Sequence, residues 1–166
     1  MTIDPELLTG LGAALSIFLS ATGSAMASAH SGTFAIRGKD AKDFVPIVIS
    51  GVLAIYGIVV AVLLCGKYGG AMTAVDGYRN LSAGLSVGLA CFASGCGIAS
   101  FVRQCNDAGA AAVARSGEAE REPLLNGTGT MVSPSRPCFI KMCMVLVFLE
   151  AIGLYGLIVA LFLMGQ

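Results

Sequence analysis

Four long apolar runs alternate with polar connections along the chain. The runs are Leu7–Ala29, Phe44–Leu64, Leu81–Val102 and Phe139–Leu163. Each is close to the ~20 residues that an α-helix needs to cross the hydrocarbon core of a bilayer. The pattern predicts an all-α membrane protein with four transmembrane helices. Asp4 and Glu6 precede the first run, unlike the basic start of a signal peptide, so we expect this helix to be retained.

The second and fourth runs repeat one another, and so do the first and third. Residues 44–65 align with 143–164 at an offset of 99, and the first run aligns with the third at an offset of 70. Shared residues include Tyr56 and Gly57 with Tyr155 and Gly156, and Ser16 and Ser24 with Ser86 and Ser94. We therefore predict two helical hairpins in tandem, residues 1–66 and 67–166. A polar insertion at about 106–137 belongs to the second hairpin, and its Pro, Gly and Ser content predicts a flexible loop.

Basic residues are concentrated at two of the three connections. Eight of the ten lie in or beside Ser31–Asp43 and Arg103–Cys138, whereas the middle connection, Cys65–Asn80, holds only Lys67 and Arg79. The positive-inside rule places connections rich in Lys and Arg on the cytosolic side. We therefore expect the middle connection and both termini to face the lumen or the exterior.

The composition supports a membrane protein and disfavours several kinds of site. Hydrophobic residues make up 56% and charged residues 12% of the chain, which is about half the charge of a soluble domain. The net charge of zero gives no sign of a nucleic-acid partner. None of the six cysteines forms a C-x-x-C pair, and several lie inside apolar runs, so we expect small packing residues and no zinc or disulfide framework. We predict no metal and no cofactor.

The first run carries a small residue at every fourth position. This small-residue stripe consists of Gly12, Ser16, Ser20, Ser24 and Ser28. Residues four apart share a helix face, and a face of small residues lets a second backbone come close. The stripe therefore predicts tight helix packing. A catalytic serine is disfavoured, because the only histidine, His30, has no acidic residue near it in the sequence.

One carboxylate, Glu150, lies about halfway along the fourth run, and no other carboxylate or base lies well inside any run. An ionised carboxylate at mid-bilayer costs roughly several kcal/mol, which favours its protonated form. Since intramembrane acids commonly mark an ion path, we interpret Glu150 as a buried proton-binding residue. A purely structural hydrogen bond between helices is the alternative. The equivalent position in the first hairpin is Gly51.

A proton is favoured over sodium at Glu150. A hard cation needs several oxygen ligands, and the second and third runs contain no Asn, Gln or Thr, although Ser and Tyr hydroxyls remain. The chain also lacks the G-x-x-x-x-G-K-[ST] sequence that binds ATP phosphates. We therefore expect no catalytic site of its own, and any link to ATP passes through partners.

Several segments resemble the proteolipid c subunits of vacuolar-type proton ATPases. Phe148–Ala160 resembles the proton-binding helix of that family, Ala54–Val62 its second helix, and Gly84–Leu89 with Asp107–Gly109 its third helix and the following loop. The resemblance covers nearly the whole chain except the insertion. It implies a proton-carrying rotor (c-ring) subunit of an ATP-driven pump in a vacuolar, lysosomal or other acidic endomembrane, with Glu150 as the proton carrier.

The resemblance also implies partners. Identical or paralogous proteolipids would form a ring, a stator subunit would supply an intramembrane arginine, and a central stalk would link the ring to the cytosolic ATP-hydrolysing sector. Tyr155 lies five residues after Glu150, in the region where macrolide inhibitors act in the family, and is a candidate for shaping the site. Because a ring needs slim inner helices, we expect the first and third helices inside and the second and fourth outside.

The insertion departs from the family pattern. Within it, Glu120, Leu124 and Leu125 resemble an acidic dileucine sorting signal, on the side predicted to be cytosolic. A tolerated loop insertion without a function is the alternative.

Two other functions remain open for the whole chain. One is a structural proteolipid that forms a channel or a membrane-fusion pore. The other is a small secondary transporter with duplicated halves, which is disfavoured because the sequence shows no second polar cluster for a solute.

Overall fold

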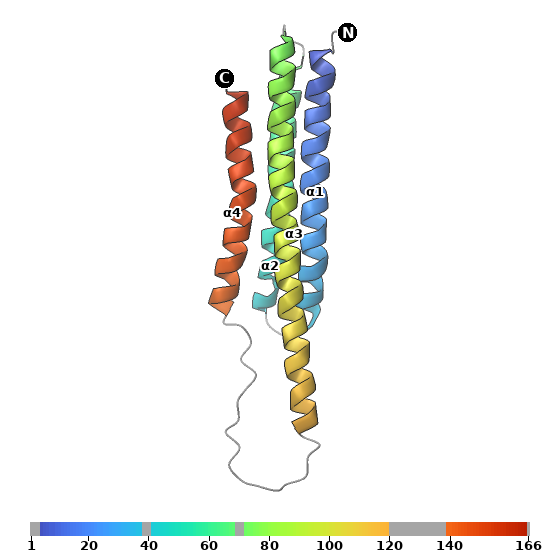
Figure 1. Cartoon of the computed structure of the whole chain (residues 1–166), viewed down its shortest axis with the longest axis vertical. Helices are drawn as coiled ribbons and strands as arrows, with labels where there is room; N and C mark the ends of the chain where they lie inside the picture. Colours follow the sequence, from blue (N-terminus) through green and yellow to red (C-terminus); the bar gives the residue numbers. More distant parts are fainter. Residues whose placement is uncertain (1–3, 38–40, 69–71, 120–138, 166) are drawn as a thin grey trace.

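Four α-helices run alternately up and down the bundle (Figure 1). The computed structural model describes residues 4–37, 41–68, 72–119 and 139–165. The helices are α1 (Pro5–Arg37), α2 (Val45–Cys65), α3 (Ala74–Ala119) and α4 (Phe139–Met164), and a 3₁₀ turn, η1 (Ala41–Phe44), leads into α2. The start of α1 and the end of α4 lie at the same end of the bundle (Figure 1).

All four helices are long and apolar enough to cross a membrane. The candidate spans, judged by length and composition, are Pro5–Arg37, Lys42–Cys65, Ala74–Ala111 and Ile140–Met164. Many large apolar side chains of α2 and α4 are exposed in the single chain, which suits helices that face lipid or other subunits. The predicted all-α fold with four membrane helices is confirmed.

α1 and α3 are longer than the apolar runs that predicted them. The 46 residues of α3 correspond to about 69 Å, more than twice the ~30 Å of the hydrocarbon core, and its last turns protrude beyond the other helices (Figure 1). Residues 106–119, which we expected to begin the inserted loop, are helical. This stretch is rich in alanine, the strongest helix former, which explains the difference. Glu120, Leu124 and Leu125 lie outside the described residues.

The contact between α1 and α3 is the most extensive in the bundle. A Cβ added to Gly12 or Gly23 of α1 would lie 2.9 or 2.8 Å from a Cα atom of α3. Gly84 and Gly95 of α3 face them, because a Cβ at either position would overlap the backbone of Gly12 or Gly23. At these two levels the helix backbones touch directly, and no larger residue fits without moving a helix.

α2 is held to α1, and α4 to α3, by equivalent hydrogen bonds. In the first, the Ser24 hydroxyl of α1 donates to the Ser50 carbonyl of α2 at 2.8 Å. In the second, the Ser94 hydroxyl of α3 donates to the Leu149 carbonyl of α4 at 2.5 Å. These positions correspond to each other at the offsets of 70 and 99 found in the sequence. The two hairpins therefore have the same internal alignment of helices.

One glycine of α2 and one of α4 also pack at equivalent positions. A Cβ on Gly57 would lie 2.6 Å from the Ser16 carbonyl oxygen, and one on Gly156 would lie 3.0 Å from the Ser86 carbonyl oxygen. Both glycines are buried against the helix of their own hairpin. The glycine of the repeated Tyr-Gly pair thus sets how closely α2 approaches α1 and α4 approaches α3.

Candidate functional site

Glu150 lies near the middle of α4 and forms a hydrogen bond with α2. Its Oε1 accepts a hydrogen bond from the Tyr56 hydroxyl at 2.8 Å. Tyr56 is its one hydrogen-bond partner within the part of the chain that the structure describes. The site therefore consists of an acid from the second hairpin and a hydroxyl donor from the first.

The other helices cover α4 at Glu150 on one side only. The side chains of Glu150 and Tyr56 are both partly buried, while Phe148 and Tyr155 of α4 are exposed. Glu150 is thus less enclosed by the single chain than the buried position we expected. The reason is its place at the edge of the bundle, where α2 and α3 contact α4 from one side (Figure 1).

Small residues bring α4 close enough for the bond to Tyr56. A Cβ on Gly153 would lie 2.8 Å from Leu53 Cδ2 of α2 and 3.5 Å from Cys91 Sγ of α3. Gly97 of α3 has a similar role, because a Cβ there would lie 2.9 Å from a methyl group of Leu149. The Ser94 bond to the Leu149 carbonyl fixes α4 one residue before Glu150. Together these contacts set the position of α4 and its rotation about its own axis, and so the direction in which Glu150 points.

Among the described residues, the Tyr56 hydroxyl is the one side-chain oxygen that bonds to Glu150. Among the residues that the structure describes, no group of three His, Cys, Asp or Glu side chains lies close enough together to hold a metal ion. The third apolar run has no side-chain amide, but α3 is longer than that run and includes Asn80 and Asn106. Their amides donate to Thr9 and Thr33 of α1, at 3.1 and 3.2 Å, toward the two ends of α1. One hydroxyl donor is far fewer than the oxygen ligands that a hard cation needs.

The serines of the small-residue stripe lie against α2, whereas Gly12 lies against α3. The Ser16 hydroxyl donates to the Gly57 carbonyl at 3.1 Å. Ser28 and Ser50 share a hydrogen bond of 2.8 Å between their hydroxyls. Ser20 is fully buried, and its Cβ would lie 2.6 Å from a Cβ on Gly57. The stripe thus packs the first hairpin and lies apart from the acid.

Tyr155 lies on an exposed side of α4, and no described residue accepts a hydrogen bond from it. The structure therefore does not bring Tyr155 to Glu150, although only five residues separate them. Tyr56, which does bond to Glu150, was not singled out from the sequence as a site residue. The signal that could have found it was the Tyr-Gly repeat, which marked this tyrosine as the counterpart of Tyr155.

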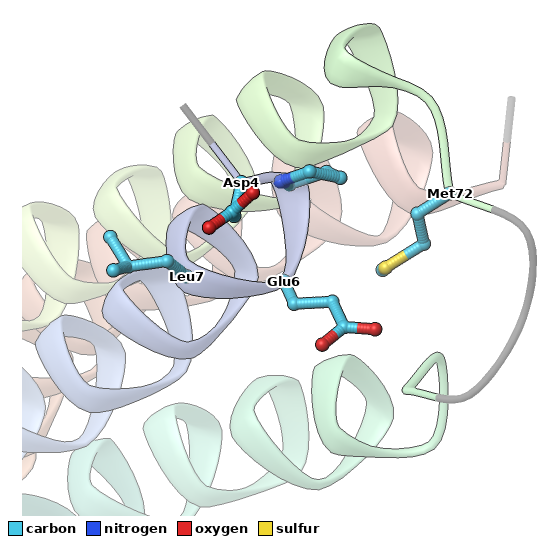
Figure 2. A pocket seen from close by; sticks show the side chains of 5 residues that line it. Asp4, Glu6, Leu7 and Met72 are labelled. Carbon is cyan, nitrogen blue, oxygen red and sulfur yellow. The ribbon is translucent and has the colours of Figure 1, made fainter. Parts of the chain in front are cut away.

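An open pocket of about 390 Å³ lies at the end of the bundle where α1 begins, and Figure 2 shows it. It is lined by Asp4, Pro5, Glu6, Leu7 and Met72. The Glu6 and Met72 side chains extend toward the same space from α1 and from the segment before α3 (Figure 2). Two exposed acids beside an open pocket do not by themselves form a site, and the pocket lies far from Glu150 along the bundle.

Comparison with known proteins gives consistent similarities over most of the chain. The V-type proton ATPase 16 kDa proteolipid subunit c of Nephrops norvegicus is 36% identical over 161 residues, which cover 92% of this chain and 87% of that protein. The Homo sapiens protein of the same name is 35% identical over 159 residues, covering 92% and 88%. The V-type proton ATPase subunit c′ of Candida glabrata is 35% identical over 162 residues, covering 92% and 84%. No family model matches the chain.

Proposed function

This chain belongs to the family of V-type proton ATPase proteolipid subunits c and c′, and from that premise we propose that it is a proton-carrying rotor subunit of an ATP-driven pump. The hydrogen bond between Tyr56 and Glu150 carries the assignment of the site. It holds one carboxyl group near the middle of a long apolar helix, at the depth where an intramembrane acid serves ion transport.

Within the described part of the chain, the Tyr56 hydroxyl is the one hydrogen-bond donor to Glu150, and this determines which charge states of the site are stable in the membrane. When Glu150 is protonated, its proton resides on one carboxyl oxygen while Oε1 accepts the Tyr56 hydrogen bond, and the pair is neutral. A neutral pair can face hydrocarbon at a modest free-energy cost, whereas an ionised carboxylate cannot. The proton therefore has to enter and leave where water or a cation meets the carboxyl group.

The transport cycle uses this difference between neutral and ionised states. Glu150 takes a proton from one aqueous half-channel and passes the lipid in its neutral form. It releases the proton at a second half-channel, where an arginine of a stator subunit stabilises the carboxylate. Rotation driven by a cytosolic ATP-hydrolysing sector, transmitted by a central stalk, supplies about 2.3 kcal/mol per proton for each 100 mV of opposing potential.

We further propose the arrangement of the subunit in an acidic endomembrane. The chain divides into hairpins 1–66 and 67–166, a division supported by the equivalent serine bonds of the two helix pairs. The connections rich in Lys and Arg face the cytosol and both termini face the lumen. Identical or paralogous proteolipids complete a ring, with α1 and α3 inside and α2 and α4 outside.

Glu150→Gln tests the proposal directly, because it keeps the size of the side chain and removes its titration. The assembled complex containing this variant is reconstituted into vesicles, and ATP-driven acidification is measured. We expect normal assembly and no pumping, whereas Glu150→Asp retains partial activity. Glu6→Gln, which changes an exposed glutamate at the start of α1, is the matched control. Pumping at the wild-type rate by Glu150→Gln would refute the proposal and favour a channel or fusion pore.

A further inference from the structure

The first half of α4 carries a shallow apolar groove, toward the end of the bundle where α3 protrudes (Figure 1). The groove has a volume of about 340 Å³ and is lined by Ile140, Cys143, Met144, Val147 and Phe148. It runs about 12 Å along the helix. All five residues belong to α4, and the side chains of Ile140, Met144 and Phe148 are more than half exposed. The described residues of the other helices therefore leave this surface uncovered.

Two cations lie at the outer end of this groove. Lys141 of α4 and Arg103 of α3 are both exposed, while Met142 and Val102, their neighbours in the chain, pack in the same core cluster. Neither cation forms an ion pair or a side-chain hydrogen bond with a described residue. Asp107, one turn after Arg103, is also exposed and does not pair with it. The charges of Lys141 and Arg103 are thus uncompensated within the described part of the chain.

The depth of the two cations matches the boundary between hydrocarbon and headgroups. The Ser94 hydroxyl of α3 bonds to the Leu149 carbonyl of α4. Lys141 and Arg103 lie about 12 and 14 Å from this bond, in the same direction, because α3 and α4 are antiparallel. Half of the hydrocarbon core is about 15 Å thick. A bilayer centred near Glu150 therefore places both cations at headgroup level, and the groove spans most of the hydrocarbon of one leaflet.

The opposite end of α4 is arranged differently. There Lys67 donates a hydrogen bond to the Met164 carbonyl at 2.8 Å, so this cation stabilises the last turn of the helix. At the first turn of α4 no acidic residue is present, and Lys141 adds its charge to the positive end of the helix dipole. The first half of α4 thus combines uncompensated positive charge with an uncovered apolar surface.

We propose that this groove and its two cations bind an anionic phospholipid, with the headgroup at Arg103 and Lys141 and an acyl chain along Ile140–Phe148. The apolar lining fits a hydrocarbon chain, and the two cations complement a headgroup that carries net negative charge. The inference requires only that α4 spans a membrane, so it goes beyond the rotor function and does not rest on it. The proposed orientation assigns the lipid to the cytosolic leaflet, where anionic lipids are concentrated.

Photoreactive phospholipids test the site in the assembled complex. The complex is reconstituted into phosphatidylcholine vesicles that contain a small fraction of a probe with a photoreactive acyl chain. One probe has a phosphatidylserine headgroup, and the other has a phosphatidylcholine headgroup. After irradiation, the labelled residues of this chain are mapped by mass spectrometry. We expect the anionic probe to label Ile140–Phe148 preferentially, and this preference should fall as the salt concentration rises, because salt screens the headgroup charge.

Substitutions separate the headgroup contact from the acyl-chain contact. Lys141→Gln and Arg103→Gln should each lower the preference for the anionic probe about fivefold, the effect of one cation near a membrane surface, whereas Lys141→Arg should retain it. Arg79→Gln, near the other end of α3, is the charge control and should leave the preference unchanged. Phe148→Ala should reduce labelling of the groove by both probes. Phe162→Ala, which changes a similarly exposed phenylalanine in the last turns of α4, should not.

Three results would overturn the inference. Equal labelling by the two probes in the unsubstituted complex would show ordinary contact with bulk lipid. Absence of labelling at Ile140–Phe148 would show that another subunit covers the groove. Loss of the preference on adding inorganic phosphate at constant ionic strength would show a site for free phosphate. None of these measurements depends on pumping, so failure of the lipid site leaves the rotor function standing, and pumping at the wild-type rate by Glu150→Gln would reject the rotor function alone.

Discussion

Alanine substitutions at three glycines of α3 should have very different effects on stability, because a new Cβ meets a different surface at each. At Gly95 it meets backbone atoms of Gly23 in α1, including the Cα at 2.7 Å. At Gly97 it meets the end of the Leu149 side chain at 2.9 Å, and at Gly109 it meets nothing within 4 Å. All three glycines lie within the same helix.

The expected magnitudes follow from two opposing terms. Alanine in place of glycine stabilises a helix interior by about 0.8–1.0 kcal/mol, and this term is common to all three variants. Gly109→Ala should therefore increase the free energy of unfolding by up to about 1 kcal/mol. Overpacking against a surface that cannot yield costs about 1–3 kcal/mol, so Gly95→Ala should be less stable than Gly109→Ala by that amount. Gly97→Ala should lie between them, because a leucine methyl group can move aside.

Unfolding of the purified chain in mixed detergent micelles, followed by circular dichroism, measures the comparison. The difference between Gly95→Ala and Gly109→Ala removes the common helix-propensity term and isolates the contact with α1. Equal unfolding midpoints for these two variants would refute the direct backbone contact between α1 and α3. A midpoint for Gly97→Ala below that of Gly95→Ala would refute the distinction between backbone and side-chain surroundings.

Three further changes test the packing, the site and the topology. Ser20→Leu places a large side chain where Ser20 is fully buried against Gly57. Overpacking of about 1–3 kcal/mol per copy should reduce the amount of assembled complex seen on native gels, with Ser20→Ala as the control. Normal assembly and pumping by Ser20→Leu would contradict this expectation. Tyr56→Phe removes the hydrogen bond from the Tyr56 hydroxyl to Glu150, so it should slow ATP-driven acidification by the reconstituted complex, whereas Tyr155→Phe should leave the rate unchanged; equal rates for the two variants would contradict the role of Tyr56. Ser116→Cys should react with an impermeant thiol reagent from the cytosolic side, and reaction from the lumenal side alone would reverse the proposed orientation.

The sequence was sufficient to predict the four membrane helices, because hydrophobic length is a strong and local signal. It also predicted that the two halves correspond, and Ser24 and Ser94 make their bonds at the positions that the offsets of 70 and 99 require. The ends of the helices were less predictable. An apolar run indicates the part of a helix that lies in hydrocarbon, but it does not indicate where the helix ends. α1 and α3 both continue beyond their apolar runs. In α3 the alanine-rich stretch at 108–114 sustains the helix where polarity suggested a loop.

The acid of the candidate site was identified from the sequence, but its partner was not. A single carboxylate within an apolar run is visible without any knowledge of packing. The bond from Tyr56 depends on how two helices 94 residues apart approach each other, and that approach depends on Gly153 and Leu53. The spacing of residues in the sequence shows which face of a helix a residue lies on. It does not show which other helix packs against that face. For the same reason the small-residue stripe predicted close packing without showing that its serines lie against α2.

In the proposed rotor, the bond from Tyr56 of α2 to Glu150 of α4 makes the site depend on both halves of the chain. A lone second hairpin would contain Glu150 without its donor, and an acid in hydrocarbon without a hydrogen-bond partner costs roughly several kcal/mol more. The first hairpin supplies that donor through the same Tyr-Gly pair that the second hairpin carries as Tyr155 and Gly156. Because Gly51 stands at the position equivalent to Glu150, α2 and α4 together carry one carboxyl group, that of Glu150. In the proposed rotor, each proton corresponds to the rotation of a whole chain past the stator, and more of the energy of one turn is available to each proton than if both hairpins carried an acid.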